Sequence, residues 1–201
     1  MERPCQIKGF RVSLRYHAEL VSSGREQVAF AQAFHIKQDM QRHLTIMVLL
    51  ILASVVQTLY YYPQLPGVIA SHFNFGGTAN GWQPKSVFFG IYGGIIVLIV
   101  LIFSASALFM DRVPDTLINL PGKDYWLAPE RRAETFSFIN GQMLMFGNAT
   151  LVFILVVFHF AIRANLTPQR QLSSSIMLPL LGAYIFFSLV WTLRFILRFR
   201  K

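Results

Sequence analysis

Four long apolar segments dominate the chain. They cover residues 44–62, 87–110, 138–162 and 176–197, and Arg194 is the only Asp, Glu, Lys or Arg within them. A helix of about 20 apolar residues crosses the hydrocarbon core of a bilayer. None of the segments alternates with the period of two that membrane barrel strands require. The pattern therefore predicts an all-α membrane protein whose domain, residues 44–197, contains four transmembrane helices.

The connecting segments differ in basic charge, and this difference predicts an orientation. Lys and Arg number seven in the arm 1–43, four in the loop 111–137 and four from Arg194 to the end of the chain. The loop 63–86 has one and the segment 163–175 has two. Basic residues resist translocation, so the more basic side is expected to be cytoplasmic. Fifteen against three predicts that both termini are cytoplasmic and that the loop 63–86 lies outside.

The N-terminal arm, residues 1–43, carries mixed charges and no motif. We expect it to be solvated or to lie among lipid headgroups. Met40, directly before the first span, is also a compact start for a membrane protein. One hypothesis is therefore that translation begins at Met40 and that residues 1–39 are not translated. At the other end, residues 198–201 form a basic tail.

Composition excludes several other classes of protein. Hydrophobic residues make up 54% of the 201 residues and charged residues 13%, where a soluble domain carries about 25% charged residues. The net charge of +9 is not gathered into a polar domain, so nucleic acid is not an expected partner. Cys5 is the only cysteine, which excludes a disulfide scaffold.

The predicted outer loop, residues 63–86, is unusual for a connection between two spans. Pro and Gly residues mark turns near both of its ends, and an apolar stretch between them carries His72 and Asn74. Such a loop is too apolar to float in water. We expect it to pack against the outer ends of the helices or to dip into the membrane interface.

The loop 111–137 ends in aromatic and charged residues. Pro129 suits the first position of a helix, and Glu130 follows it where the helix dipole favours an acid. The sequence predicts a cytoplasmic elbow, in which a short interfacial segment is followed by a helix that continues into the third span. Arg131 and Arg132 would face headgroups or pair with Asp124 and Glu130. This cluster either fixes the elbow or forms a docking or signalling face, and its members are Lys123, Asp124, Tyr125, Trp126, Pro129, Glu130, Arg131 and Arg132.

Two motifs resemble those of a known family. The first motif, LP…HFN…G…GW…K, consists of Leu65, Pro66, His72, Phe73, Asn74, Gly77, Gly81, Trp82 and Lys85. The second is the stretch from Asn119 to Arg132, which reads NLPGKDYWLAPERR. With the four spans, the two motifs make residues 44–197 similar, over most of their length, to the bacterial membrane family called domain of unknown function 1648.

The resemblance implies a multi-pass protein of the bacterial cytoplasmic (inner) membrane. The family has no established general activity. Some relatives are immunity proteins that protect a bacterium from its own sporulation-delaying toxin and signal the presence of the toxin, and these usually have additional spans. Immunity and signalling are therefore candidate roles, with a peptide or protein ligand on the outer side.

The predicted binding residues of the outer loop are His72, Asn74, Gly81, Trp82 and Lys85. A lone histidine is more often a structural residue, and this alternative stays open for His72. His159, in the third span, is expected at a similar depth, so a metal-dependent hydrolase that uses His72 and His159 is an alternative function. Zinc needs three or four ligands, which makes the pair a weak candidate, and we expect neither a metal nor a cofactor.

The leading hypothesis is a membrane protein that is not an enzyme and that senses or binds a ligand through the outer loop. The common catalytic motifs of hydrolases and nucleotide-binding enzymes are missing from the sequence. A small transporter or a subunit of an oligomeric channel is a further alternative. Within the spans, we expect Asn148 to hydrogen-bond another helix, and Gly90 and Gly94 to allow close packing in the monomer or, alternatively, dimerisation.

Overall fold

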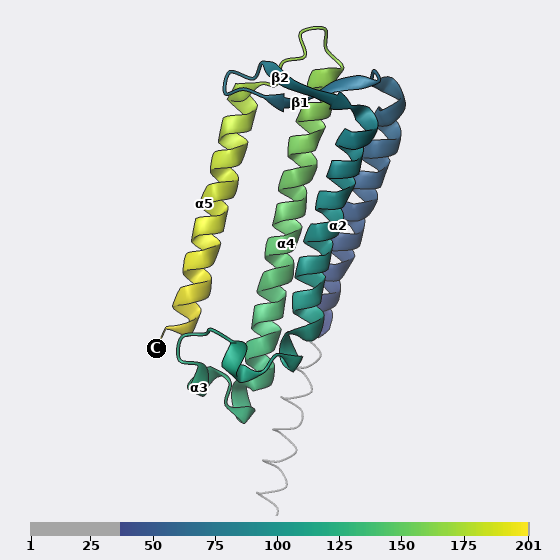
Figure 1. Cartoon of the computed structure of the whole chain (residues 1–201). Helices are drawn as coiled ribbons and strands as arrows, with labels where there is room; N and C mark the ends of the chain where they lie inside the picture. Colours follow the sequence, from purple (N-terminus) through teal and green to yellow (C-terminus); the bar gives the residue numbers. More distant parts are fainter. Residues whose placement is uncertain (1–36, 201) are drawn as a thin grey trace, which may run out of the picture. The chain divides into compact units, whose positions relative to one another are not determined.

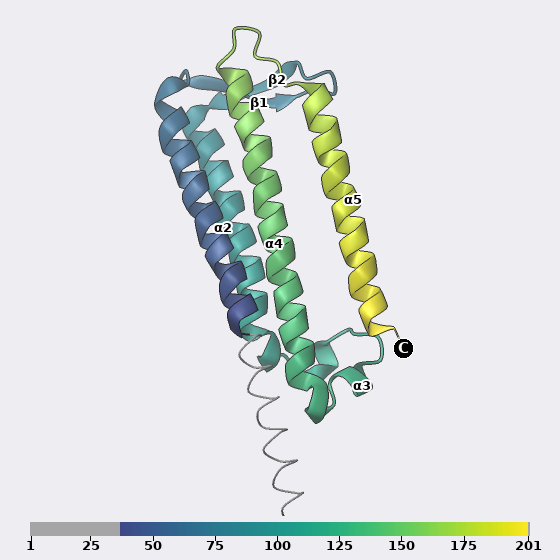
Figure 2. The same ribbon diagram turned by 180° about the vertical axis from the view of Figure 1, so that it is seen from behind.

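The computed structural model describes residues 37–200 and contains four helices that are long and apolar enough to cross a membrane (Figures 1 and 2). The first covers residues 37–61 and ends in a 3-10 turn, η1 (Tyr62–Gln64). The others are α2 (Lys85–Phe109), α4 (Pro129–Asn165) and α5 (Ser174–Phe199). Four apolar helices of this length imply a lipid bilayer around them, as the sequence predicts.

The chain divides into two compact units, residues 1–41 and 42–201, and the fold described below belongs to the second. Most of the N-terminal arm, including nearly all of the segment before Met40, lies outside the described residues. The end of the helices near residues 62–84 is called the hairpin end. The opposite end, near residues 110–128, is called the elbow end.

Most of the segment 63–86 forms a β-hairpin, and the all-α prediction is wrong for this part of the chain. Two strands, β1 (Val68–Phe73) and β2 (Ala79–Pro84), pair antiparallel and lie across the ends of the helices (Figure 1). The ladder shifts register twice, between Ala70 and His72 and again between His72 and Phe73. These bulges break the alternation of buried and exposed positions by which a strand is recognised in a sequence.

The hairpin is fastened to the end of α4 by Asn165, which is buried. Its side-chain oxygen accepts a hydrogen bond of 2.7 Å from the Ala70 N–H, and its amide donates one of 2.8 Å to the Ala70 carbonyl. The same amide donates to the Ala161 carbonyl in the last turns of α4. Asn165 thus pairs with β1 in the way that a neighbouring strand would.

Polar side chains also tie the first helix to α2 and α4 inside the membrane domain. The Tyr92 hydroxyl donates to the Gln57 side-chain oxygen over 2.6 Å, and the Gln57 amide reaches the Leu155 carbonyl over 3.3 Å. Asn148 donates to the His43 carbonyl on the first helix. The prediction that Asn148 hydrogen-bonds another helix is therefore confirmed.

Close packing of α2 against α4 occurs at Gly147. A Cβ atom at this position would lie 2.6 Å from the Phe103 ring, so only glycine admits the ring here. Gly90 and Gly94 have no neighbouring atoms within reach of a Cβ. The prediction that these two glycines allow packing within the monomer is wrong, because the face of α2 on which they lie meets no other helix.

The last helix, α5, is attached to α4 mainly by aromatic side chains. Phe146 lies 4.5 Å from Trp191 between ring centroids, and Phe153 stacks on Tyr184 at 4.2 Å. The Tyr184 hydroxyl also hydrogen-bonds Thr150 over 2.8 Å. Of all the residues of α5, only Phe199 is buried. The large rings keep the two helices apart, and α5 stands away from the other helices in both views (Figures 1 and 2).

Replacement of Asn165 by Leu tests the attachment of the hairpin. The change keeps the side-chain volume but leaves the buried N–H and carbonyl of Ala70 without partners, which we expect to lower the free energy of unfolding by about 2 kcal/mol or more. The measurement is unfolding in mixed detergent micelles followed by circular dichroism. Asn119→Leu, at an exposed position of the elbow, is the matched control. Equal losses in the two variants would contradict the assignment.

Candidate functional site

Three of the five predicted binding residues, His72, Asn74 and Trp82, are exposed. His72 is exposed on β1, where Nδ1 lies 2.5 Å from the Asn80 side-chain oxygen. Trp82 on β2 has 49% of its surface exposed, and the Arg170 guanidinium lies 5.0 Å from its ring centroid. An exposed aromatic ring with a cation on its face combines apolar and polar contact in one place, which is typical of recognition surfaces.

Asn74, Gly81 and Lys85 build the hairpin. The Asn74 side-chain oxygen accepts a hydrogen bond from the Thr78 N–H across the turn. Gly81 faces His72, whose Cβ would lie 2.8 Å from a Cβ at this position. Lys85 donates to the Tyr62 and Leu65 carbonyls and so satisfies the end of the first helix. The contacts of these three residues lie within the protein itself and shape the hairpin.

The tip of the hairpin is tied to the segment that leads into α5. The Leu172 N–H donates to the Gly77 carbonyl over 2.8 Å, and the Ser174 hydroxyl donates to the Phe75 carbonyl over 3.1 Å. Gly77 adopts a φ of 81°, which favours glycine. The hairpin tip is therefore hydrogen-bonded to the first residue of α5 and to the segment just before it.

His72 and His159 have different neighbours. His72 contacts Asn80 on the partner strand, whereas the His159 ring packs against Tyr61 with ring centroids 5.7 Å apart. Among residues 37–200, no group of three or more His, Cys, Asp or Glu side chains gathers in a way that could hold a metal ion. The hydrolase alternative would thus have to operate without such a cluster in the described part of the chain.

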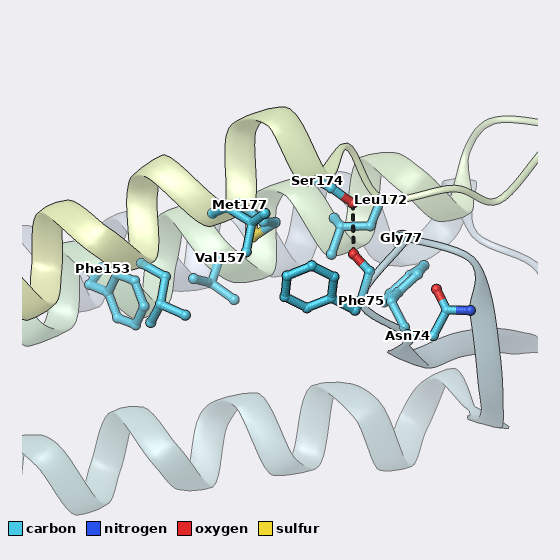
Figure 3. Close-up of a pocket in the computed structure, with 11 residues that line it drawn as sticks. Asn74, Phe75, Gly77, Phe153, Val157, Leu172, Ser174 and Met177 are labelled. Carbon is cyan, nitrogen blue, oxygen red and sulfur yellow. Dashed lines mark hydrogen bonds between the residues drawn. The ribbon is translucent and has the colours of Figure 1, made fainter.

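An apolar groove lies beneath the hairpin tip, between α4 and α5 (Figure 3). Its volume is about 270 Å³, and its walls come from the tip, from Phe153 and Val157 of α4, and from Leu172 to Leu181. The Phe75 side chain extends from the tip toward Val157 and Met177 (Figure 3), and yet 83% of its surface is exposed. A phenylalanine this exposed beside an open apolar groove marks a contact surface for a ligand or lipid.

At the elbow end, a short helix α3 (Lys123–Trp126) precedes α4, and Pro129 occupies the first turn of α4. The predicted order of elements, a short segment followed by a helix that continues into the third span, is confirmed. The Trp126 indole donates to the Phe199 carbonyl over 3.2 Å. This contact joins the elbow to the end of α5.

The predicted pairing of the elbow arginines with Asp124 and Glu130 is wrong, and the alternative that they face lipid headgroups stays a prediction. Arg132 pairs with Asp115 rather than with Asp124 or Glu130. Arg131 donates to the Tyr125 carbonyl and lies 3.6 Å above the Tyr125 ring. The aromatic residues of the elbow therefore hold its arginines in place. Lys123, Asp124 and Glu130 have exposed or partly exposed side chains at the ends of α3 and α4.

Two parts of this site have little signal in the sequence. Asn165 begins an Asn-Leu-Thr tripeptide, which reads as a glycosylation sequon, and only the structure assigns its amide to β1. The groove is formed by the hairpin tip and by parts of α4 and α5 that lie about 80 to 100 residues further along the chain. An exposed Phe in a turn, Phe75, is the one feature from which a contact surface there could have been inferred.

The fold and the hairpin define a membrane protein with four candidate spans and an ordered, partly exposed β-hairpin between the first two. Residues 49–96 match the model of the domain of unknown function DUF1648, so the chain contains this domain. The match begins in the first helix, includes the whole hairpin and ends within α2. The elbow motif lies beyond it. No curated protein and no solved structure matches the chain.

Replacement of Gly77 by Ala tests the link between the hairpin and α5. Alanine would have to adopt the positive φ of this position, which is strained for it, and its Cβ would clash with the Leu172 carbonyl. We therefore expect the Gly77–Leu172 hydrogen bond to break. The measurement is hydrogen exchange of peptides that cover residues 74–78 and 171–175, which should become markedly faster. Gly76→Ala is the matched control, because its Cβ would only touch the Asn74 side chain. Unchanged exchange in Gly77→Ala would contradict the link.

Proposed function

We propose that this protein is a ligand-binding protein of the bacterial inner membrane that is not an enzyme, and that the β1–β2 hairpin is its recognition element. The observation that carries the proposal is the construction of the hairpin. Asn165 and Lys85 fasten it to the helices, while His72 and Trp82 remain exposed on its surface. A rigid scaffold that presents a few exposed side chains is how binding loops are generally built.

The contacts of α5 suggest how binding would be signalled. At the hairpin end, α5 follows Leu172 and Ser174, which bond to the hairpin tip. At the elbow end, Phe199 accepts a hydrogen bond from Trp126, and the Arg198 guanidinium lies 5.0 Å from the Trp126 ring centroid. A ligand that shifts the hairpin would shift α5 and thereby the elbow. This path supports a role in signalling or immunity, with a peptide or protein as the ligand.

The proposal places the hairpin outside the cell and the elbow in the cytoplasm, as the distribution of Lys and Arg predicts. A Cys5→Ser background removes the only native cysteine, and a single cysteine is then introduced at Trp82 or at Leu117, both of which are well exposed. We expect a membrane-impermeant maleimide to label Trp82→Cys in intact cells and Leu117→Cys only after permeabilisation. Labelling in the reverse pattern would refute the orientation.

His72→Ala and Trp82→Ala test the recognition surface. Both positions are exposed, so we expect each variant to insert and to stay within about 0.5 kcal/mol of wild-type stability, but to lose the phenotype of the protein. The measurement is survival of a deletion strain, complemented with each variant, in the concentrated stationary-phase supernatant of the same bacterium. Leu117→Ala, an exposed change at the elbow end, should complement fully. If His72→Ala and Trp82→Ala also complement fully, the hairpin is not the recognition element.

A further inference from the structure

The groove between α4 and α5 exists because the aromatic side chains that separate the two helices stop partway along them. Aromatic contacts run from Phe138 and Phe195 near the elbow end as far as Phe153 and Tyr184. Beyond that point α4 presents Val157, which is too small to fill the same separation. The hairpin closes the top of the gap, and about 270 Å³ remains open. In a membrane, hydrocarbon must fill this volume, because water has no polar partners there.

The groove offers few polar groups to a ligand. Asn74 and Ser174 are the only residues with polar side chains among its lining residues. The Asn74 side-chain oxygen already accepts from the Thr78 N–H, and the Ser174 hydroxyl already donates to the Phe75 carbonyl. The remaining lining side chains are Phe, Val, Leu and Met. The chemistry of the walls therefore selects a ligand that needs no hydrogen bond over this length, such as a hydrocarbon chain.

The groove is too small to enclose a whole turn of a helix. A helix with its side chains is about 10–12 Å across and rises 5.4 Å per turn, so a single turn occupies roughly 400 Å³ or more. This exceeds the 270 Å³ available. A single acyl chain is narrow enough to enter. It would lie along Phe153 and Val157 on one side and along Met177 and Leu181 on the other.

The charge at the mouth of the groove indicates the headgroup. Arg170 lies two residues before Leu172, which lines the groove, and its guanidinium stacks on Trp82. A stacked guanidinium keeps its N–H donors available at its edge. The segments 63–86 and 163–175 contain three basic residues and no Asp or Glu. The two ion pairs found among residues 37–200 both lie at the elbow end. The hairpin end is therefore complementary to a phosphate.

We propose that the groove between α4, α5 and the hairpin tip holds one acyl chain of an anionic phospholipid of the bilayer, and that Arg170 binds the lipid phosphate. The bound chain completes the interface of α5 where the aromatic contacts end, and Phe75 covers it from the hairpin side. Arg170 adjoins the exposed Trp82 surface, but the groove itself is lined by neither His72 nor Trp82, and lipid retention is measured without reference to the function proposed for the hairpin.

Native mass spectrometry of the full chain in mild detergent tests this site. The protein is mixed with phosphatidylglycerol or with phosphatidylcholine of identical acyl chains. We expect one tightly retained lipid, with phosphatidylglycerol preferred by about fivefold, which corresponds to about 1 kcal/mol for one basic residue. Arg170→Gln should abolish the preference, whereas Arg200→Gln, at the elbow end, should keep it. Equal retention of the two lipids by the wild type would overturn the assignment of the headgroup.

Variants that fill the groove with a larger side chain distinguish an acyl chain bound there from the lipids that surround the protein. Val157→Phe should lose the retained lipid, and Val152→Phe, an exposed position of α4 outside the groove, should keep it. Leu181→Phe and its control Ile185→Phe make the same comparison on α5, in case one variant does not fold. Circular dichroism and size-exclusion chromatography establish that each variant is folded. Retention by the groove variants equal to that of their controls, or a lipid-free dimer, would overturn the proposal.

Discussion

The pair of hydrogen bonds between the Asn165 side chain and the Ala70 backbone is the interaction on which the hairpin end depends. A strand at the boundary of a membrane has a row of backbone N–H and carbonyl groups, and any of them that is buried without a partner is costly. A second sheet strand is the usual solution. Here one amide side chain at the end of α4 replaces it, since it donates and accepts at once. With Ala70 fixed, the rest of the hairpin is held in register over the helix ends, and its tip can reach the segment before α5.

The attachment of α5 follows from this arrangement. The helix is not held by close backbone packing, because large aromatic rings separate it from α4. Besides these aromatic contacts, its connections are the hairpin tip at one end, the Thr150–Tyr184 hydrogen bond along its length and the Trp126–Phe199 contact at the other end. A helix joined to its neighbours in this way can change its angle at a lower cost than a helix buried by interlocking aliphatic side chains. The groove is the visible consequence of the same separation.

The sequence predicts the helices well and the contacts between them poorly. Span positions depend on local hydropathy, so the four apolar segments correspond to the four long helices, and Pro129 correctly marks the start of α4. Helix contacts depend on which faces meet. Gly90 and Gly94 have the spacing of a packing motif but face no helix, while Gly147, without such a partner in the sequence, receives the Phe103 ring. The hairpin is not predicted from the sequence because its bulges disrupt the alternation of buried and exposed residues along β1. The role of Asn165 is not predicted either, because its partner Ala70 lies 95 residues away in the chain.

That separation of 95 residues between Ala70 and Asn165 has a consequence for biogenesis. The ribosome adds about 5–20 residues per second, so β1 is synthesised roughly 5–20 s before the side chain that completes its edge. During this interval α2 and then α4 are synthesised, while β1 lacks its partner at Ala70. The hairpin can therefore reach its final state only when the third span has been inserted with Asn165 at the same membrane surface. The hydrogen bonds of Ala70 thus depend on correct insertion of α4, and a chain whose third span failed to insert would leave the N–H and the carbonyl of Ala70 without this partner.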